Sequence, residues 1–361
     1  MTSKVPVAVV GVSWRSAPTH VRAQLASLAD EKDPARELRH SGYVSGAVRV
    51  VTCSRTEWIL TADNPDWAAT LLKGALMSRV EGLSEEQLHV RAGGASIHYV
   101  LRVAVGLDSV AEGEGAVGRQ VLKSFEQART AGLTDRRMRL LWKQVERLIR
   151  ARREKTPGAQ TRGVQSLVRD ALKESKGVQN VAIFGRGDFG LAIERSLRAT
   201  GRWNVTTWSR QTIDDFLEQA SSVDAVVVCT GGARAWLELP RRREVGLCID
   251  ASSPPQVKPV EGWHIIGLDA LLARPDIELS DDERGRLDHL VMSATEELSR
   301  TLAARSTSST LAAIDAARTT FLNEQLPALL VGLPKEQVKR VRQAVGAFTH
   351  DILKKTREVS S

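Results

Sequence analysis

A glycine-rich turn at residues 185–190 constrains the fold of this chain more than any other feature. The turn is Gly-Arg-Gly-Asp-Phe-Gly, the run before it at 181–184 is apolar, and a helical segment at 191–200 follows. A second apolar run at 205–208 comes next. Strand, glycine turn, helix and parallel strand together form the unit that binds dinucleotides. This part of the chain is therefore predicted to be a Rossmann-like α/β domain.

Three further strand-length apolar runs extend the same pattern, at residues 225–229, 247–249 and 264–266. Strands that alternate with helical or polar segments predict a parallel sheet. We expect this domain to span residues 157–280, because Pro157 and Gly158 interrupt the helical pattern before it.

The glycine turn also supplies candidate contacts to a dinucleotide, whose phosphates would lie at the N-terminus of the following helix. The candidates are Gly185, Gly187, Asp188, Phe189 and Gly190. After the second strand, Ser209 and Arg210 stand where an NAD site usually has an acidic residue. A hydroxyl and a cation suit a 2′-phosphate, so NADPH is the expected cofactor. A glycine turn without a ligand is the alternative.

Cys53 is the candidate nucleophile of the region before this domain. It follows an apolar run at 48–51, and Arg55 two residues later would favour its thiolate form. A purely structural cysteine is the alternative. Cys229 and Cys248 lie in or at the end of apolar runs and are expected to be small core residues.

Composition limits the remaining possibilities. Three scattered cysteines do not form a disulfide framework or a zinc site, and no metal site is expected. No apolar stretch approaches the ~20 residues that span a bilayer. Both observations favour a cytoplasmic protein.

The segment 136–155 is strongly basic, within a chain of net charge +8. It has nine Arg or Lys and two acids, and its apolar residues recur with helical spacing. One face is therefore predicted to pack inward and the other to be cationic. A phosphate backbone is the natural partner of such a face, and a solvated surface is the alternative.

Residues 281–361 are predicted to be helical, with three apolar stripes. The stripes are Leu287, Leu290, Val291, Ala294, Leu298 and Leu302; Ile314, Ala317, Phe321 and Leu322; and Val338, Val341, Val345, Phe348 and Ile352. Such stripes pack against each other or against a second copy of the chain. Dimerisation is preferred here over a closed intramolecular bundle.

Several of these segments resemble glutamyl-tRNA reductases. Residues 52–57, Thr-Cys-Ser-Arg-Thr-Glu, resemble the family motif Thr-Cys-Asn-Arg-Thr-Glu, and residues 102–109 resemble its next signature. The resemblance runs along the whole chain, and it is most specific in the first region. Its other elements are Val10-Gly11-Val12, Ala17-Pro18, Arg22, Gly113-Glu114, Gln120-Val121, Asp250-Ala251, Pro254, Val257 and Pro259.

The resemblance implies a multidomain α/β fold: an N-terminal α+β catalytic domain at 1–156, the NADP-binding domain, and a helical dimerisation domain at 281–361. It implies that Cys53 attacks the ester of glutamyl-tRNA and that NADPH reduces the resulting thioester to glutamate-1-semialdehyde, a tetrapyrrole precursor. It also implies a V-shaped homodimer that holds the tRNA. An aminotransferase that consumes the aldehyde is a further expected partner.

The resemblance also assigns a substrate pocket. Arg55 would bind the side-chain carboxylate of the substrate, and the other pocket positions are Thr52, Tyr99, Ser109, Glu114 and Gln120. Helix capping by Asp108 or Ser109 is the alternative for that segment. The chain differs from the family at Ser54 (Asn), Tyr99 (His), Gly115 (Pro) and Ala116 (Gln).

These differences leave other functions open. The first is a divergent relative that reduces glutamyl-tRNA or another aminoacyl-tRNA for a specialised pathway. The others are a non-catalytic relative that binds tRNA or a protein partner, and an ordinary NADP dehydrogenase. Retention of both Cys53 and the glycine turn favours the reductase.

Overall fold

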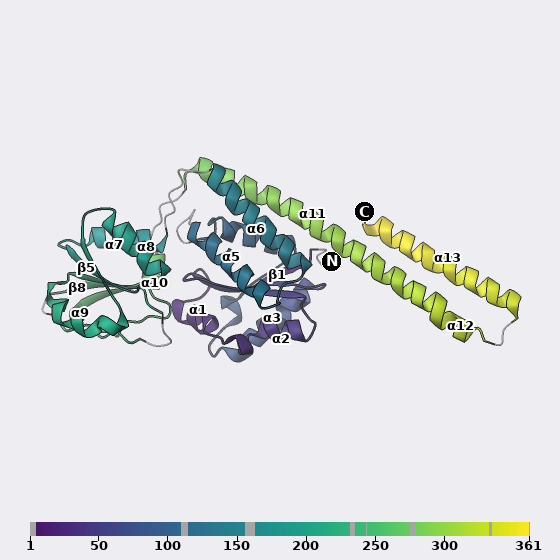
Figure 1. Cartoon of the computed structure of the whole chain (residues 1–361), viewed down its shortest axis with the longest axis horizontal. Helices are drawn as coiled ribbons and strands as arrows, with labels where there is room; N and C mark the ends of the chain where they lie inside the picture. Colours follow the sequence, from purple (N-terminus) through teal and green to yellow (C-terminus); the bar gives the residue numbers. More distant parts are fainter. Residues whose placement is uncertain are drawn as a thin grey trace.

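The computed structural model describes residues 5–109, 115–155, 163–231, 235–242, 244–274, 279–331 and 334–360. The chain forms an elongated molecule (Figure 1). An N-terminal domain lies in the middle, a parallel-sheet domain lies at one end, and two long helices extend from the other end.

The N-terminal domain is built on a four-stranded antiparallel sheet with the strand order β2-β3-β1-β4. Its strands are β1 (Val7–Ser13), β2 (Gly46–Val51), β3 (Arg55–Thr61) and β4 (His89–Ala92). Alternate residues of β1 face opposite sides: Val7 and Val9 belong to one apolar cluster, and Ala8 and Val10 to another. Both faces of the sheet are therefore covered, which is why β1 is apolar at almost every position.

Helices cover the two faces of this sheet. The side of Ala8 carries α1 (Thr19–Ala26), α2 (Pro34–His40) and α3 (Pro65–Arg79). The side of Val7 carries α4 (Gly94–Ala104), α5 (Gly115–Thr130) and the basic helix α6 (Arg136–Lys155). The apolar face of α6 is buried as predicted, and the helix has the predicted bounds.

The second domain contains the predicted parallel sheet, with the strand order β6-β5-β7-β8-β9. Its strands are β5 (Asn180–Phe184), β6 (Asn204–Trp208), β7 (Ala225–Val228), β8 (Gly246–Asp250) and β9 (Trp263–Gly267). Its helices are α7 (Val164–Glu174), α8 (Asp188–Arg198), α9 (Ile213–Gln219) and α10 (Leu268–Leu272). Helix α8 begins three residues before the predicted helix, because Gly187 is its N-cap.

The C-terminal region is a helical hairpin. Helix α11 (Asp281–Thr320) is 40 residues long, α12 (Leu326–Leu329) is short, and α13 (Lys335–Ser360) returns along α11 (Figure 1). No helix in the described ranges is both long and apolar enough to cross a membrane.

The first apolar stripe of this region packs differently from the prediction. Leu287, Val291 and Leu298 belong to the core of the N-terminal domain, where α11 contacts α4 and α6. The expectation that this stripe meets the other stripes or a second copy is wrong, because the N-terminal domain supplies the apolar surface that covers it. On α13, Phe348 is 67% exposed. Ile314 and Ile352 have side chains outside the described set. The homodimer stays a prediction.

Candidate functional site

Cys53 lies at the tip of the turn that joins β2 to β3. The backbone N–H of Thr52 donates to the carbonyl of Arg55 at 2.9 Å. The Thr52 hydroxyl accepts from the backbone N–H groups of Ser54 and Arg55, each at 3.1 Å. Cys53 itself is half-buried. Thr52 therefore fixes the conformation that presents the thiol.

Arg55, two residues after Cys53, is fully buried in a polar network below the turn. One terminal nitrogen lies 2.7 Å from the Tyr99 hydroxyl, 3.2 Å from Asp108 Oδ2 and 3.3 Å from Glu57 Oε1. The other terminal nitrogen donates to the Asp108 carbonyl. The Arg55 charge is thus paired with two carboxylates, and Asp108 serves this network rather than a helix cap.

This network fixes the protonation of its members. Burial opposes ionisation of Glu57, but the Arg55 guanidinium and His89 outweigh it and hold the pKa of Glu57 below its usual range. Burial and then the Glu57 charge raise the pKa of Tyr99, so its phenol stays neutral and donates to Glu57. Tyr99 therefore anchors the network and does not act as a base near neutral pH.

Some buried polar atoms in the same region lack hydrogen-bond partners among the described residues. They include Nε of Arg55 and the hydroxyl of Ser109, which is 2% exposed. Buried polar atoms are nearly always hydrogen-bonded, so a polar ligand would satisfy both. Of the other predicted pocket residues, Gln120 is exposed on α5 and Glu114 lies outside the described residues.

Sequence reasoning missed His89 as a member of this network. Its ring lies edge-on to that of Tyr99, with 5.4 Å between centroids, and its Nε2 is 3.2 Å from Glu57 Oε1. Residue 89 lies on β4, whose residues pair with β1. No motif marked it in the sequence.

The three glycines of the 185–190 turn have different surroundings. Gly185 has a φ of +131°, and a Cβ atom there would lie 2.6 Å from the Cys229 carbonyl oxygen. A Cβ atom at Gly190 would lie 2.1 Å from the Gly185 carbonyl oxygen. A Cβ atom at Gly187 would meet nothing within 4 Å. Packing thus requires two of the glycines, and the third leaves open space beside the N-terminus of α8.

That open space is consistent with a nucleotide cofactor. Gly187 caps α8 without a side-chain hydrogen bond, so the first amides of the helix are available to an anion. Ser209 and Arg210 follow β6, the strand beside β5. The Arg210 guanidinium lies 4.7 Å from the centroid of the Trp236 ring and donates to the Gly231 carbonyl at 2.9 Å. Trp236 is a second residue that the sequence did not single out.

Of the other two cysteines, Cys248 is a core residue as predicted, and Cys229 is partly buried at the edge of the core. Cys248 is buried, and the Cys229 thiol donates to the Phe184 carbonyl at 3.1 Å. Burial raises the pKa of Cys229 to about 12. Neither is a nucleophile at neutral pH.

The thiol turn faces the parallel-sheet domain. Trp14 and Cys53 pack against the apolar core of that domain, together with Phe189 and Cys229 at its edge. Phe189 belongs to the glycine turn, and Cys229 follows β7. Ligands of open α/β sheets bind outside the carboxyl ends of the strands. The candidate nucleophile and nucleotide site are therefore brought together across the domain boundary.

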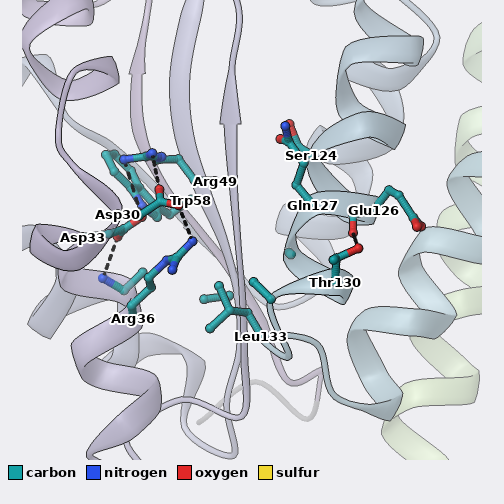
Figure 2. A pocket seen from close by; sticks show the side chains of 14 residues that line it. Asp30, Asp33, Arg36, Arg49, Trp58, Ser124, Glu126, Gln127, Thr130 and Leu133 are labelled. Carbon is teal, nitrogen blue, oxygen red and sulfur yellow. Dashed lines mark hydrogen bonds and ion pairs between the residues drawn. The ribbon is translucent and has the colours of Figure 1, made fainter.

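A separate pocket of about 520 Å³ lies at the other end of β2 (Figure 2). Arg36 and Arg49 project into it from one side, and both are already paired with Asp30. Gln127 and Thr130 of α5 lie on the other side. None of the sequence-predicted site residues is among its described lining residues, so this pocket is not the candidate site.

Comparison with known proteins identifies the family. The profile of the glutamyl-tRNAGlu reductase N-terminal domain matches residues 10–156. The glutamyl-tRNA reductase of Clavibacter michiganensis is 26% identical over 292 residues, which are 68% of this chain and 66% of the relative. Glutamyl-tRNA reductase 1 of a Nocardioides species is 22% identical over 408 residues, which are 98% of this chain and 92% of that protein. Residues 10–156 belong to the family of glutamyl-tRNAGlu reductase N-terminal domains, and most of the chain is similar to glutamyl-tRNA reductases.

The solved structure of the family member from Methanopyrus kandleri shares the fold. It matches with a TM-score of 0.50 and 18% identity, and the match covers 98% of this chain and 97% of that one. The match to the first relative spans just under two thirds of that relative's length. The match over residues 10–156 confirms the resemblance that residues 52–57 indicated, and the roles of individual site residues stay predictions.

Proposed function

We propose that this protein reduces glutamyl-tRNA to glutamate-1-semialdehyde with NADPH, through a thioester on Cys53. The observation that carries the proposal is the placement of Cys53. The residue lies at the tip of a hydrogen-bonded turn and packs against the edge of the domain that carries the glycine turn.

The Cys53 thiolate would attack the ester carbonyl carbon, forming a C–S bond as the C–O bond to the tRNA breaks. The tRNA oxygen would leave with the C–O electron pair and take a proton from solvent. Bound NADPH would supply the hydride for the thioester carbonyl carbon. When the C–S bond breaks, the sulfur would regain its electron pair, restoring the Cys53 thiolate and releasing the aldehyde.

The polar network below the turn would hold the acyl group. Nε of Arg55 and the Ser109 hydroxyl are buried donors without hydrogen-bond partners among the described residues, and both suit carboxylate or carbonyl oxygens. Glu57 and Tyr99 would keep the guanidinium in place. Thr52, Glu114 and Gln120 are proposed to line the substrate pocket, as the resemblance implied.

The glycine turn would hold the cofactor. The pyrophosphate would lie over Gly187 and the N-terminus of α8, beside Asp188 and Phe189. Ser209 and Arg210 would bind the 2′-phosphate. The pairing of Arg210 with Trp236 keeps the cation at the carboxyl end of the sheet.

The basic face of α6 would bind the tRNA backbone. Its exposed residues include Arg139, Lys143, Arg147, Arg150 and Arg153, spaced three or four apart along one side. Such a stripe can contact successive phosphates. A homodimer, a cytoplasmic location and an aminotransferase that consumes the aldehyde complete the proposal.

The test is tRNA-dependent oxidation of NADPH, followed by absorbance, with trapping of the aldehyde product. The intact protein should turn over glutamyl-tRNA and not free glutamate. Cys53→Ser should abolish product, and Cys248→Ala, at a buried core thiol, should leave the rate within about twofold. Equal turnover by Cys53→Ser would remove Cys53 from the mechanism.

A second candidate, reduction of a different aminoacyl-tRNA, is favoured by one observation. Arg55 is already paired with Asp108 and Glu57, so its charge is balanced before any acidic substrate binds. The same assay with tRNAs charged with neutral amino acids distinguishes the two. Faster turnover of a neutral aminoacyl-tRNA would identify that aminoacyl-tRNA, in place of glutamyl-tRNA, as the substrate.

A further inference from the structure

Asp269 joins the two halves of the candidate site. It lies in the first turn of α10, and its carboxylate accepts three hydrogen bonds from α1, some 250 residues earlier in the chain. The backbone N–H of Thr19 donates at 2.8 Å, and Nη2 of Arg22 donates at 3.1 Å. The third donor is the Thr19 hydroxyl.

The contact takes the place of a helix cap. The N-cap of α1 is Pro18, whose side chain makes no hydrogen bond, so the first amides of the helix need another acceptor. A carboxylate at a helix N-terminus also interacts favourably with the helix dipole. Asp269 supplies from the other domain both the acceptor for the helix amide and the negative charge at the positive end of the helix dipole.

Arg22 extends this contact to the thiol turn. Its side chain is 2% exposed, and it donates to the carbonyls of Ala17 at 2.7 Å and Cys53 at 3.4 Å. The same guanidinium therefore holds the Cys53 backbone and the Asp269 carboxylate. Because the guanidinium is rigid and planar, its contact with Asp269 fixes the position of the second domain relative to the thiol.

We propose that Asp269 is a positioning residue that docks the nucleotide domain on the thiol turn for the reduction step. The proposal rests on the proposed function. Acyl transfer needs Cys53 and the pocket of the N-terminal domain alone. Hydride transfer needs the nucleotide domain to place its cofactor beside the acyl group on Cys53. Loss of the Asp269 contact therefore slows reduction and spares thioester formation.

The experiment separates the two steps in the full-length protein. Asp269→Ala removes all three acceptor contacts, and Asp269→Asn keeps an acceptor for Thr19 but removes the charge facing Arg22. The matched control is Asp214→Ala, an exposed acid in the first turn of α9 in the same domain. Single-turnover thioester formation without NADPH, the NADPH dissociation constant and the rate of aldehyde release are measured for each variant.

We expect both Asp269 variants to form the thioester and bind NADPH within about twofold of the parent protein. Aldehyde release should fall about tenfold to a hundredfold in Asp269→Ala and less in Asp269→Asn, since small displacements of reacting groups cost that much. Small-angle X-ray scattering should show a larger radius of gyration for Asp269→Ala only.

Unchanged aldehyde release in both Asp269 variants would overturn the proposal, and so would an equal loss of thioester formation and reduction. Absence of the thioester in the parent protein would instead refute the proposed function. If Asp269→Ala does not fold, Asp269→Asn gives the same comparison.

Discussion

The glycine turn allows one prediction in which two similar substitutions impair different properties, stability and cofactor binding. Gly190→Ala places a Cβ atom 2.1 Å from the Gly185 carbonyl oxygen and 3.2 Å from the Cys229 sulfur. Contacts under 3.0 Å to backbone require the backbone to move, so α8 must shift from β5. Overpacking of this kind costs about 1–3 kcal/mol. Gly190→Ala should lower the free energy of unfolding by that amount in the absence of cofactor.

Gly187→Ala places its Cβ atom in open space. Its φ of −75° is accessible to alanine, so loss of a glycine N-cap should cost no more than about 1 kcal/mol. The new methyl group would occupy the space proposed for the pyrophosphate. We expect the NADPH dissociation constant to rise about tenfold, equivalent to about 1.4 kcal/mol.

Urea unfolding without cofactor and NADPH titration, both followed by tryptophan fluorescence, measure the two effects. Unchanged stability of Gly190→Ala would show that α8 and β5 are not in close contact. Unchanged NADPH affinity of Gly187→Ala would show that the phosphates do not lie over residue 187.

Other predictions concern a thiol, the tRNA surface and the helical core. With a pKa of about 12, Cys229 is about one part in ten thousand thiolate at pH 8. Its alkylation rate, measured by mass spectrometry, should therefore rise about tenfold per pH unit up to pH 11. An alkylation rate that does not change with pH would contradict its burial. Charge reversal at Arg147 and Arg150 should weaken tRNA binding and reduce the slope of log K against log salt concentration by about 2. An unchanged slope would mean that this face of α6 is a solvated surface. Leu298→Ala should cost about 2–5 kcal/mol in urea unfolding, whereas Met292→Ala, at an exposed position of the same helix, should cost less than about 1 kcal/mol; equal effects would contradict the packing of α11 on the N-terminal domain.

Local patterns in the sequence were sufficient to predict the basic helix α6 and the parallel sheet. Helix α6 has the predicted bounds because its buried residues recur with helical spacing. The turn at 185–190 was predictable because Gly185 and Gly190 leave no room for a Cβ atom, and Gly185 also has a positive φ.

Long-range packing was not predictable in the same way. The stripe that includes Leu287 and Leu298 indicated a buried face, but a stripe does not say which surface covers it. Arg55 was expected to be available to a substrate carboxylate, and the structure pairs it with Asp108, 53 residues away. Asp269 had no motif around it, and its significance comes only from the distant Thr19 that it contacts.

The central claim is that Cys53 carries the acyl group between the tRNA and the reductant. The most direct test is single-turnover incubation of the protein with tRNA charged with labelled glutamate, followed by mass spectrometry of the peptide that contains Cys53. The thioester mechanism predicts label on that peptide without NADPH, and its release as aldehyde when NADPH is added. Aldehyde formation with no label ever on Cys53 would rule out the thioester.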